Sequence, residues 1–301
     1  MSESYEFIDH CAAEYVYPII KMCAWLEVSK SGFYDWRDRP QSATAARRDE
    51  LTVLIEVIFK DSDETYGYRR VHAEVWRRGE QAGPELVRAI MRAEGLVACQ
   101  PRPWRHCLTQ QGSAGPIPDL VERCFTAEEP GNKFVGDITY IATWQGWVYL
   151  ATVIDCATKA VVGFAMDDNY KTPLISAAMD MAARNGAIMP DAIFHSDRGS
   201  NYTSAEFAEK LASLGMRQSV GRTGTCYDNA MAESFFAALK NELVHRTAYS
   251  TRIRAMADIA RYIVVRYNTR RIHSGLGYRT PQETYDDYIS RRQAASLLHL
   301  L

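Results

Sequence analysis

The chain lacks any apolar run of the roughly 20 residues that a membrane-spanning helix needs. Its start, Met-Ser-Glu-Ser-Tyr-Glu, lacks the basic residues and apolar segment of a secretory signal. The seven cysteines stand singly, with no Cys-x-x-Cys pair, which argues against both a disulfide framework and a zinc site. From these absences we expect a cytoplasmic protein that has no membrane partner.

A strong net charge is also missing. The formal charge is −2 and the pI is near 6.4, values that on their own argue against a nucleic-acid partner. The distribution of charge differs from the sum. Between residues 240 and 279, nine Lys and Arg side chains stand against two acids, a net charge of +7 that is typical of a phosphate-binding surface. A weaker excess of +4 between residues 66 and 106 is equally compatible with a solvated helix face.

The first hundred residues have the pattern of short helices. Residues 17–37 and residues 69–95 each predict a pair of helices with the outline of a helix-turn-helix, and residues 44–60 predict one longer helix between them. On the second pair, Arg88 and Arg92 face outward and are candidate DNA contacts, although any two amphipathic helices give this pattern.

The length predicts about two domains. Proline and glycine are frequent between residues 101 and 131, as in a linker. We therefore divide the chain into an N-terminal helix-turn-helix-like segment at 1–42, a helical, helix-turn-helix-like DNA-binding domain at 43–100, a linker at 101–131, a catalytic core with basic C-terminal helices at 132–289 and a tail at 290–301.

Beyond the linker, strand patterns dominate. The expected elements are strands at 133–143, 147–155 and 160–166, a helix at 173–185, a strand at 191–196, a helix at 204–214, a strand at 216–220, and helices at 228–243, 251–267 and 281–293. This order predicts an α/β fold in which helices flank a mixed sheet, the ribonuclease-H-like arrangement, preceded by a small all-α region.

Three carboxylates stand out in this half of the chain. Asp137 lies inside an apolar strand, Asp197 ends an apolar run, and Glu233 borders the buried face of its helix. Burying ionised carboxylates is costly without a counter-charge, so together they predict a site for Mg²⁺ or Mn²⁺. Lys240, one heptad after Glu233, suits a phosphate contact. An Asp hydrogen-bonded to backbone and a solvent-exposed helix lysine are the structural alternatives.

Several motifs surround these acids. They are Asp-Ile-Thr-Tyr-Ile from 137, His-Ser-Asp-Arg-Gly-Ser-Asn-Tyr-Thr-Ser from 195, Asp-Asn-Ala-Met-Ala-Glu-Ser-Phe-Phe from 228 and Tyr-Asn-Thr-Arg-Arg-Ile-His from 267, with 35 residues between Asp197 and Glu233. With these motifs the chain resembles the DDE transposases and retroviral-type integrases. More narrowly, it resembles the second-frame (orfB-type) transposase of insertion sequences in the IS-three family.

The resemblance implies that Asp137, Asp197 and Glu233 are catalytic and hold two divalent ions, Mg²⁺ or Mn²⁺, and that Lys240 contacts transposon-end DNA. It implies metal-dependent cleavage of the element ends and transfer of the 3′-OH into DNA. The partners would be the terminal inverted repeats and target DNA, further copies of the chain in a homo-oligomer on DNA, and the upstream-frame protein or a fusion with it. The place of action would be the bacterial cytoplasm, at the nucleoid when the protein is bound to DNA.

Further candidates adjoin the acids or lie in the basic stretch. We expect His195 and Asn229 to support the metal ligands rather than to react. Arg222, Arg266, Arg270 and Arg271 are candidate DNA contacts, although the loop of Arg222 could equally be plain and flexible. Two alternative functions stay open, a ribonuclease-H-like nuclease without strand transfer and a non-catalytic DNA-binding regulator or inactive remnant.

Overall fold

The computed structural model describes residues 2–15, 17–99, 117–221 and 229–298. The chain divides into two compact units, Met1–Val57 and Ile58–Leu301. In the described ranges, no helix is both long enough and apolar enough to span a bilayer. The finer five-part division made from the sequence remains a prediction.

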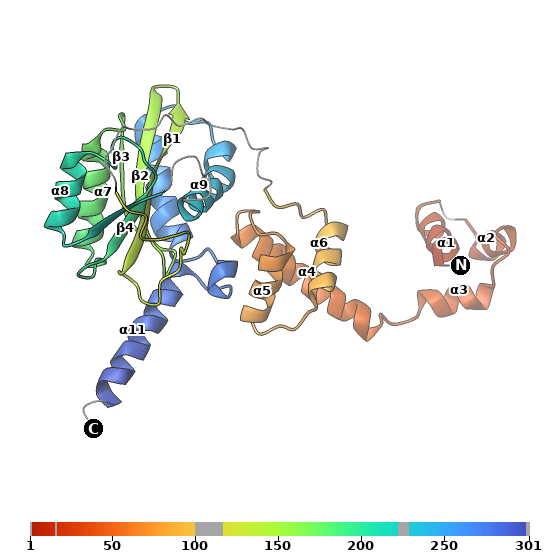
Figure 1. Cartoon of the computed structure of the whole chain (residues 1–301). Coiled ribbons are helices and arrows are strands. Elements are labelled where there is room, and N and C mark those ends of the chain that lie inside the picture. Colours follow the sequence, from red (N-terminus) through yellow and green to blue (C-terminus); the bar gives the residue numbers. More distant parts are fainter. Residues whose placement is uncertain (1, 16, 100–116, 222–228, 299–301) are drawn as a thin grey trace. The chain divides into compact units, whose positions relative to one another are not determined.

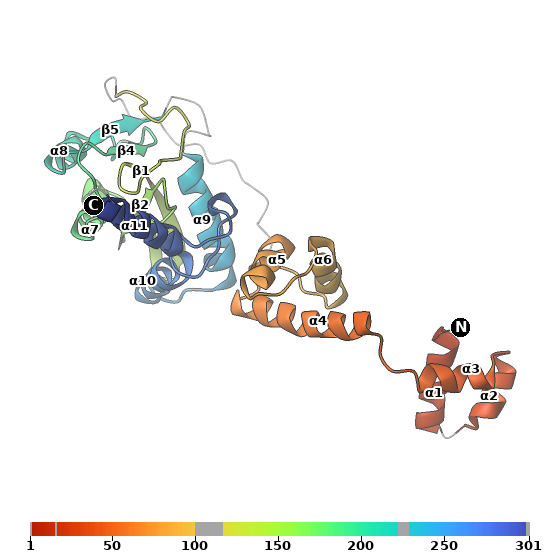
Figure 2. The ribbon, with the colours of Figure 1, turned by 90° about the horizontal axis from the view of Figure 1, so that it is seen from below.

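The first unit is helical, with α1 (Ser2–Tyr15), α2 (Ile19–Trp25), α3 (Lys30–Arg37) and most of α4 (Ala43–Asp61) (Figure 2). Its small core includes Ile8, Cys23 and Phe33. The hydroxyl of Ser29 accepts a hydrogen bond from Gly32 N at 3.2 Å, which caps α3. Helices α2, α3 and α4 were predicted from the sequence, and α1 was not.

In the second unit, α5 (Tyr68–Arg77) and α6 (Pro84–Ala93) pack together. Val71 and Val75 on α5 and Val87 and Ile90 on α6 are buried. Pro84 occupies the first turn of α6, where its missing N–H leaves no helical hydrogen bond unmade. These are the two helices expected between residues 69 and 95.

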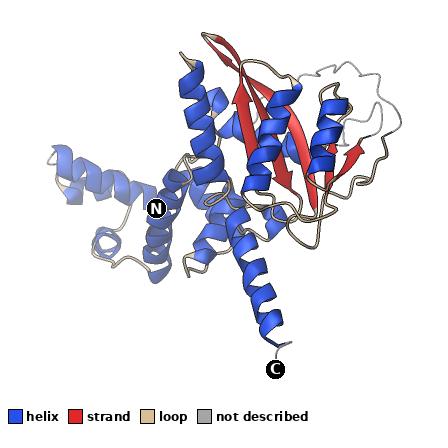
Figure 3. Cartoon of the chain, turned by 90° about the vertical axis from the view of Figure 1, so that its left-hand side faces the viewer, coloured by secondary structure: helices blue, strands red, loops and turns tan. Residues whose placement is uncertain are grey.

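A five-stranded sheet forms the centre of the second unit (Figures 1 and 3). Its strands are β1 (Lys133–Thr143), β2 (Gly146–Asp155), β3 (Val161–Asp167), β4 (Ile193–Ser196) and β5 (Arg217–Val220), in the order β3-β2-β1-β4-β5. The first three strands are antiparallel, whereas β4 pairs in parallel with both β1 and β5. This is the predicted ribonuclease-H-like mixed sheet.

Helices cover both faces of the sheet. They are α7 (Thr172–Arg184), α8 (Ala205–Ser213), α9 (Ala230–Glu242) and α10 (Arg252–Arg261). The unit also contains α11 (Pro281–Leu298) and short helical turns at Val244–Arg246, Tyr262–Tyr267 and Ser274–Leu276. Phe134 faces the layer of α7 and α8, whereas its neighbour Val135 faces the layer of α9 and α10. This alternation is the period of two expected for a strand buried on both faces. The stretch from residue 290, expected to be a tail, continues α11 to Leu298.

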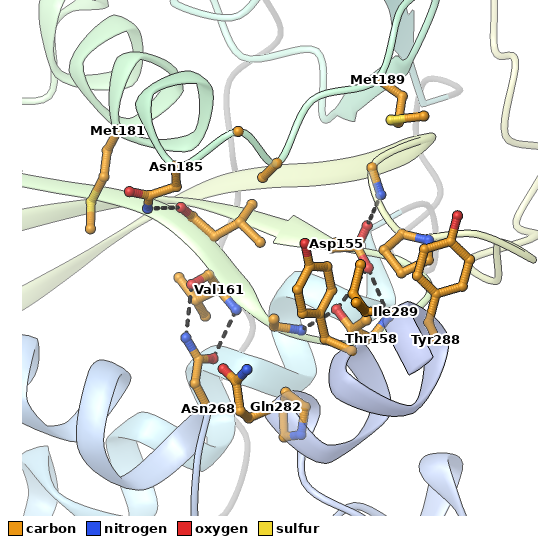
Figure 4. A pocket seen from close by; sticks show the side chains of 18 of the residues that line it. Asp155, Thr158, Val161, Met181, Asn185, Met189, Asn268, Gln282, Tyr288 and Ile289 are labelled. Atoms are coloured by element: carbon orange, nitrogen blue, oxygen red, sulfur yellow. Dashed lines mark hydrogen bonds between the residues drawn. The ribbon is translucent and has the colours of Figure 1, made fainter. Parts of the chain in front are cut away.

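A cavity of about 450 Å³ lies between β3, the end of α7 and α11 (Figure 4). Asn268 reaches the edge of β3, where its side chain accepts a hydrogen bond from Val161 N at 3.0 Å and donates one to Val161 O at 2.9 Å. Asp155 accepts hydrogen bonds from Gly131 N and Thr158 N at 2.8 and 2.7 Å. Asp155 therefore caps the turn between β2 and β3.

Candidate active site

Asp137 and Asp197 belong to neighbouring parallel strands. Val135 on β1 pairs with His195 on β4, so continuing this register by two residues brings Asp197, just past the end of β4, level with Asp137. Both residues are half-buried. Asp137 Oδ1 accepts a hydrogen bond from Ile138 N at 2.7 Å, and Asp197 Oδ1 accepts one from Gly199 N at 3.0 Å. The backbone thus holds one oxygen of each carboxylate.

Gly136 lets the two strands approach at this point. A Cβ at Gly136 would lie 2.2 Å from Cζ of Phe194, the ring that packs on β1 from β4. No real side chain is accommodated at that distance. The glycine that immediately precedes Asp137 is therefore explained by packing.

Helix α9 runs along β1 and contacts it at two points, one on either side of Glu233. At the start of the helix, Asn229 Nδ2 donates a hydrogen bond to Gly136 O at 3.1 Å. Near its end, Lys240 Nζ lies 5.4 Å from the ring centre of Tyr140. The seven helical residues from Glu233 to Lys240 and the three strand residues from Asp137 to Tyr140 each span about 10 Å. This match places Glu233, which is exposed, beside Asp137.

The charges of this site influence one another. Burial, followed by the negative charges of Asp197 and Glu233, raises the pKa of Asp137 to about 8, despite opposing effects of the hydrogen bond from Ile138 and of Lys240. Burial also raises the pKa of Glu233. The charges of Asp197, Glu233 and Lys240 therefore all act on Asp137. Across the described ranges, no three His, Cys, Asp or Glu side chains are yet gathered into a set that could hold an ion as they stand.

Two buried polar atoms next to the acids have no hydrogen-bond partner in the described part of the chain, Tyr202 Oη and Asn229 Oδ1. The pKa of Tyr202 is raised by burial and by the charges of Asp137 and Asp197. Tyr202 was not among the residues predicted from the sequence, although it lies in the same motif as Asp197.

His195 is buried beside Asp197 in the sequence. Its Nδ1 lies 2.8 Å from the Ser219 hydroxyl on β5. The imidazole therefore supports the pairing of β4 with β5, directly before the residue that carries the second carboxylate.

The prediction that the arginines after α9 contact DNA requires a correction. Arg271 is buried, and its Nη2 lies 2.8 Å from Oε1 of Glu242, the last residue of α9. Arg266 is half-buried; it pairs with Asp63 and donates to Thr65 Oγ1 at 2.9 Å. The prediction that Arg271 faces DNA is therefore corrected, because its guanidinium is buried against Glu242. Arg266 is engaged nearer the surface, where its partner Asp63 is exposed.

The other arginines predicted to contact DNA are exposed where the structure describes them. Arg270 is exposed, as are Arg88 and Arg92 on α6. The guanidinium of Arg88 lies 3.6 Å from Glu85. Arg222 lies outside the described residues.

Comparison with known proteins agrees with this architecture. Residues 46–104 match the HTH-like domain family, and residues 127–226 and 214–281 match two models of the integrase core domain. The transposase InsF for insertion sequence IS3 of Escherichia coli (strain K12) is 34% identical over 281 residues, which cover 93% of this chain and 97% of that protein. The chain belongs to the IS3-family transposases. It is therefore a DNA transposase and an enzyme of the DDE transposase and integrase class, as predicted.

Other relatives of this IS3-family transposase include an uncharacterized 31 kDa protein of insertion element IS600 from Shigella sonnei, 33% identical over 89% of this chain and 98% of the relative. Among solved structures, the HTLV-2 integrase catalytic core domain in complex with magnesium is 16% identical. Its TM-score is 0.41, with coverage of 52% of this chain and 98% of that one.

Proposed function

We propose that the transposase cleaves the ends of its insertion sequence and joins the exposed 3′-OH to target DNA, at a site formed by Asp137, Asp197 and Glu233. The observation that carries the proposal is the pairing of β1 with β4, whose register, when continued, brings Asp197 level with Asp137 next to the helix α9 that carries Glu233. Acids that repel one another at a single point are expected where a cation binds.

The donor set fits a divalent ion. Carboxylate oxygens are the ligands preferred by Mg²⁺ and Mn²⁺, and a cation would offset the burial and the negative charges that raise the pKa of Asp137. Asp137 and Asp197 are fixed by backbone hydrogen bonds, so Glu233 is the member whose exposed side chain can turn toward them. Two bound ions would activate the attacking water or 3′-OH and stabilise the leaving oxygen.

The remaining residues position DNA. Lys240 lies about 10 Å along α9 from Glu233, where its ammonium can hold a phosphate close to the reacting bond. Arg270, Arg88, Arg92 and Arg222 supply further phosphate contacts. The substrates are the terminal inverted repeats and target DNA, bound by more than one copy of the chain, with the upstream-frame protein or a fusion as a further partner. This action takes place in the bacterial cytoplasm, at the nucleoid.

Three isosteric variants, Asp137→Asn, Asp197→Asn and Glu233→Gln, test the site. With labelled element-end DNA and Mg²⁺, we expect each to lose cleavage and joining by at least about a thousandfold, because a ligand charge is removed while shape is kept. DNA affinity without metal should stay within about threefold. Glu206→Gln, an exposed acid on α8, is the matched control.

Product analysis separates strand transfer from simple hydrolysis. A nuclease would release cut ends and never join them to a second DNA. Full activity in any one of the three variants would remove that residue from the site.

A further inference from the structure

The β1–β2 hairpin carries an exposed group of aromatic side chains, the aromatic platform, consisting of Tyr140, Trp147, Tyr149 and Tyr170. Tyr140 and Trp147 are each 48% exposed and Tyr170 is 55% exposed. The rings of Tyr140 and Trp147 meet edge to face at 5.0 Å, and those of Tyr149 and Tyr170 lie 5.3 Å apart.

The strand register explains why these rings gather. Tyr140 pairs with Tyr149, and Ala142 pairs with Trp147. Directly opposite residues share a face of the sheet, as do residues two apart in one strand. Tyr140, Tyr149 and Trp147 therefore lie on the same face. β4 pairs with Lys133–Val135 of β1, several residues before the platform begins.

Packing does not account for aromatic rings at this degree of exposure. Three large rings left about half open to water form an apolar surface that ordinarily marks a contact with another molecule. Their flat faces suit partners that are themselves flat and aromatic.

The platform is attached to the candidate active site. Lys240 Nζ lies 5.4 Å from the ring centre of Tyr140, so the proposed phosphate contact and the first ring adjoin. Asp137 and Tyr140, three residues apart, point to opposite faces of β1, and Lys240 reaches Tyr140 past the part of β1 that lies beyond its pairing with β4. Along β1, Tyr140 is about 10 Å from Asp137, and the level of Trp147 is about 17 Å from it. At 3.4 Å per stacked nucleotide, these lengths correspond to roughly three to five nucleotides.

Charge indicates which half of the platform a DNA strand would occupy. The cation Lys240 borders Tyr140. The Tyr170 end is bordered by Asp167 and Asp168, of which Asp168 pairs with Arg252. A polyanion is therefore favoured along the half of the platform that contains Tyr140 and Trp147.

We propose that this half of the aromatic platform stacks unpaired bases of the DNA strand that enters the active site, while Lys240 holds its backbone. The inference rests on the proposed function, because it assumes that DNA reaches Asp137. Cationic grooves combined with aromatic rings bind single-stranded nucleic acid without reading its sequence, since every base has a π face. The platform thereby favours element ends whose terminal pairs are opened.

The test compares two element-end DNAs of the same sequence, one fully paired and one with four unpaired nucleotides next to the cleavage position. Affinity is measured by fluorescence anisotropy without divalent metal, so the result does not depend on catalysis. Trp147→Ala should weaken binding of the unpaired-end DNA by about tenfold or more, the effect of losing one stacked base, and change duplex binding less than twofold. Trp147→Phe should stay near wild type, and Trp147→Leu, which keeps apolar bulk, should follow Trp147→Ala.

Trp144→Ala is the matched control, because Trp144 is 79% exposed on the same hairpin but outside the platform. A 2-aminopurine at an unpaired position should be quenched by wild type and by Trp147→Phe, and not by Trp147→Ala. Equal affinity ratios for the two DNAs in all variants, without a difference in quenching, would overturn the proposal.

If Trp147→Ala changes the sedimentation of the DNA-free protein and leaves DNA binding intact, the platform is a contact between copies of the chain. That result would also overturn the proposal. Failure of the acid variants to lose cleavage would affect only the proposed function, because these binding measurements contain no metal.

Discussion

Replacing Arg271 with Met tests whether the basic stretch after α9 is a DNA surface or part of the core. The side chains of Arg271 and Glu242 are 8% and 5% exposed. Arg271 Nε donates to both carboxylate oxygens of Glu242, at 2.9 and 3.1 Å, and Tyr262 Oη donates to the same carboxylate at 2.9 Å. Burial alone would lower the pKa of Arg271, but the charge and hydrogen bonds of Glu242 outweigh burial and raise it.

Removing one member of such a pair leaves a buried charge without its partner. We therefore expect Arg271→Met to lower the free energy of unfolding by about 3 to 5 kcal/mol. Adding Glu242→Leu should restore much of the loss, because an apolar pair of similar volume replaces a buried ion pair at little cost or even a gain. The two changes should thus be strongly non-additive.

Urea unfolding followed by circular dichroism gives the stability of the single and double variants. The slope of DNA affinity against salt, measured on the same proteins, reports phosphate contacts. Arg271→Met should leave this slope unchanged while the protein is folded, whereas Arg270→Ala, at an exposed neighbour, should reduce it by about one. A loss of less than about 1 kcal/mol in Arg271→Met, together with a reduced salt slope, would refute the buried role.

Three further predictions concern single residues. Gly136→Ala should lower the free energy of unfolding by about 1 to 3 kcal/mol, because its Cβ would meet Phe194 at 2.2 Å; an unchanged melting temperature would contradict this packing. Asn229→Leu should leave Gly136 O without its donor, cost about 1 to 3 kcal/mol and reduce kcat more than DNA affinity, and equal losses in both would argue against a positioning role. Burial, followed by the charges of Arg271 and Arg70, lowers the pKa of His273 to about 3, so the folded protein loses stability as pH falls from about 6.5 toward 3. His273→Gln should flatten that decline in urea titrations, and an identical decline would show that other groups cause it.

The order of elements could be predicted because its signals are local. Alternating apolar residues defined β1 and β2, and Pro84 marked the start of α6. The helix α1 had a signal too, with Tyr5, Ile8 and Cys11 at helical spacing on its buried side.

Residue partners across the fold could not be predicted in the same way. In the net charge of residues 240–279, Glu242 is only one of two acids among nine cations. In the structure, Glu242 is buried and requires a counter-charge, which removes Arg271 from the surface. Which arginine it takes depends on how the chain returns after α10, and nothing in a local window specifies that. The same limit concealed Tyr202, whose place beside Asp137 follows from strand pairing rather than from its own neighbours.

Helix α9 is held in place at both of its ends. Its start is tied to β1 through Asn229 and Gly136, and its end is fixed by the ion pair of Glu242 with Arg271. About 20 Å of helix between the two ties presents Glu233 and Lys240 on the side facing the acids of the sheet. Loosening either tie would let Glu233 drift from Asp137 while leaving the exposed cations able to meet DNA. Damage to α9 far from the acids should therefore separate DNA binding from catalysis, and binding should survive longer.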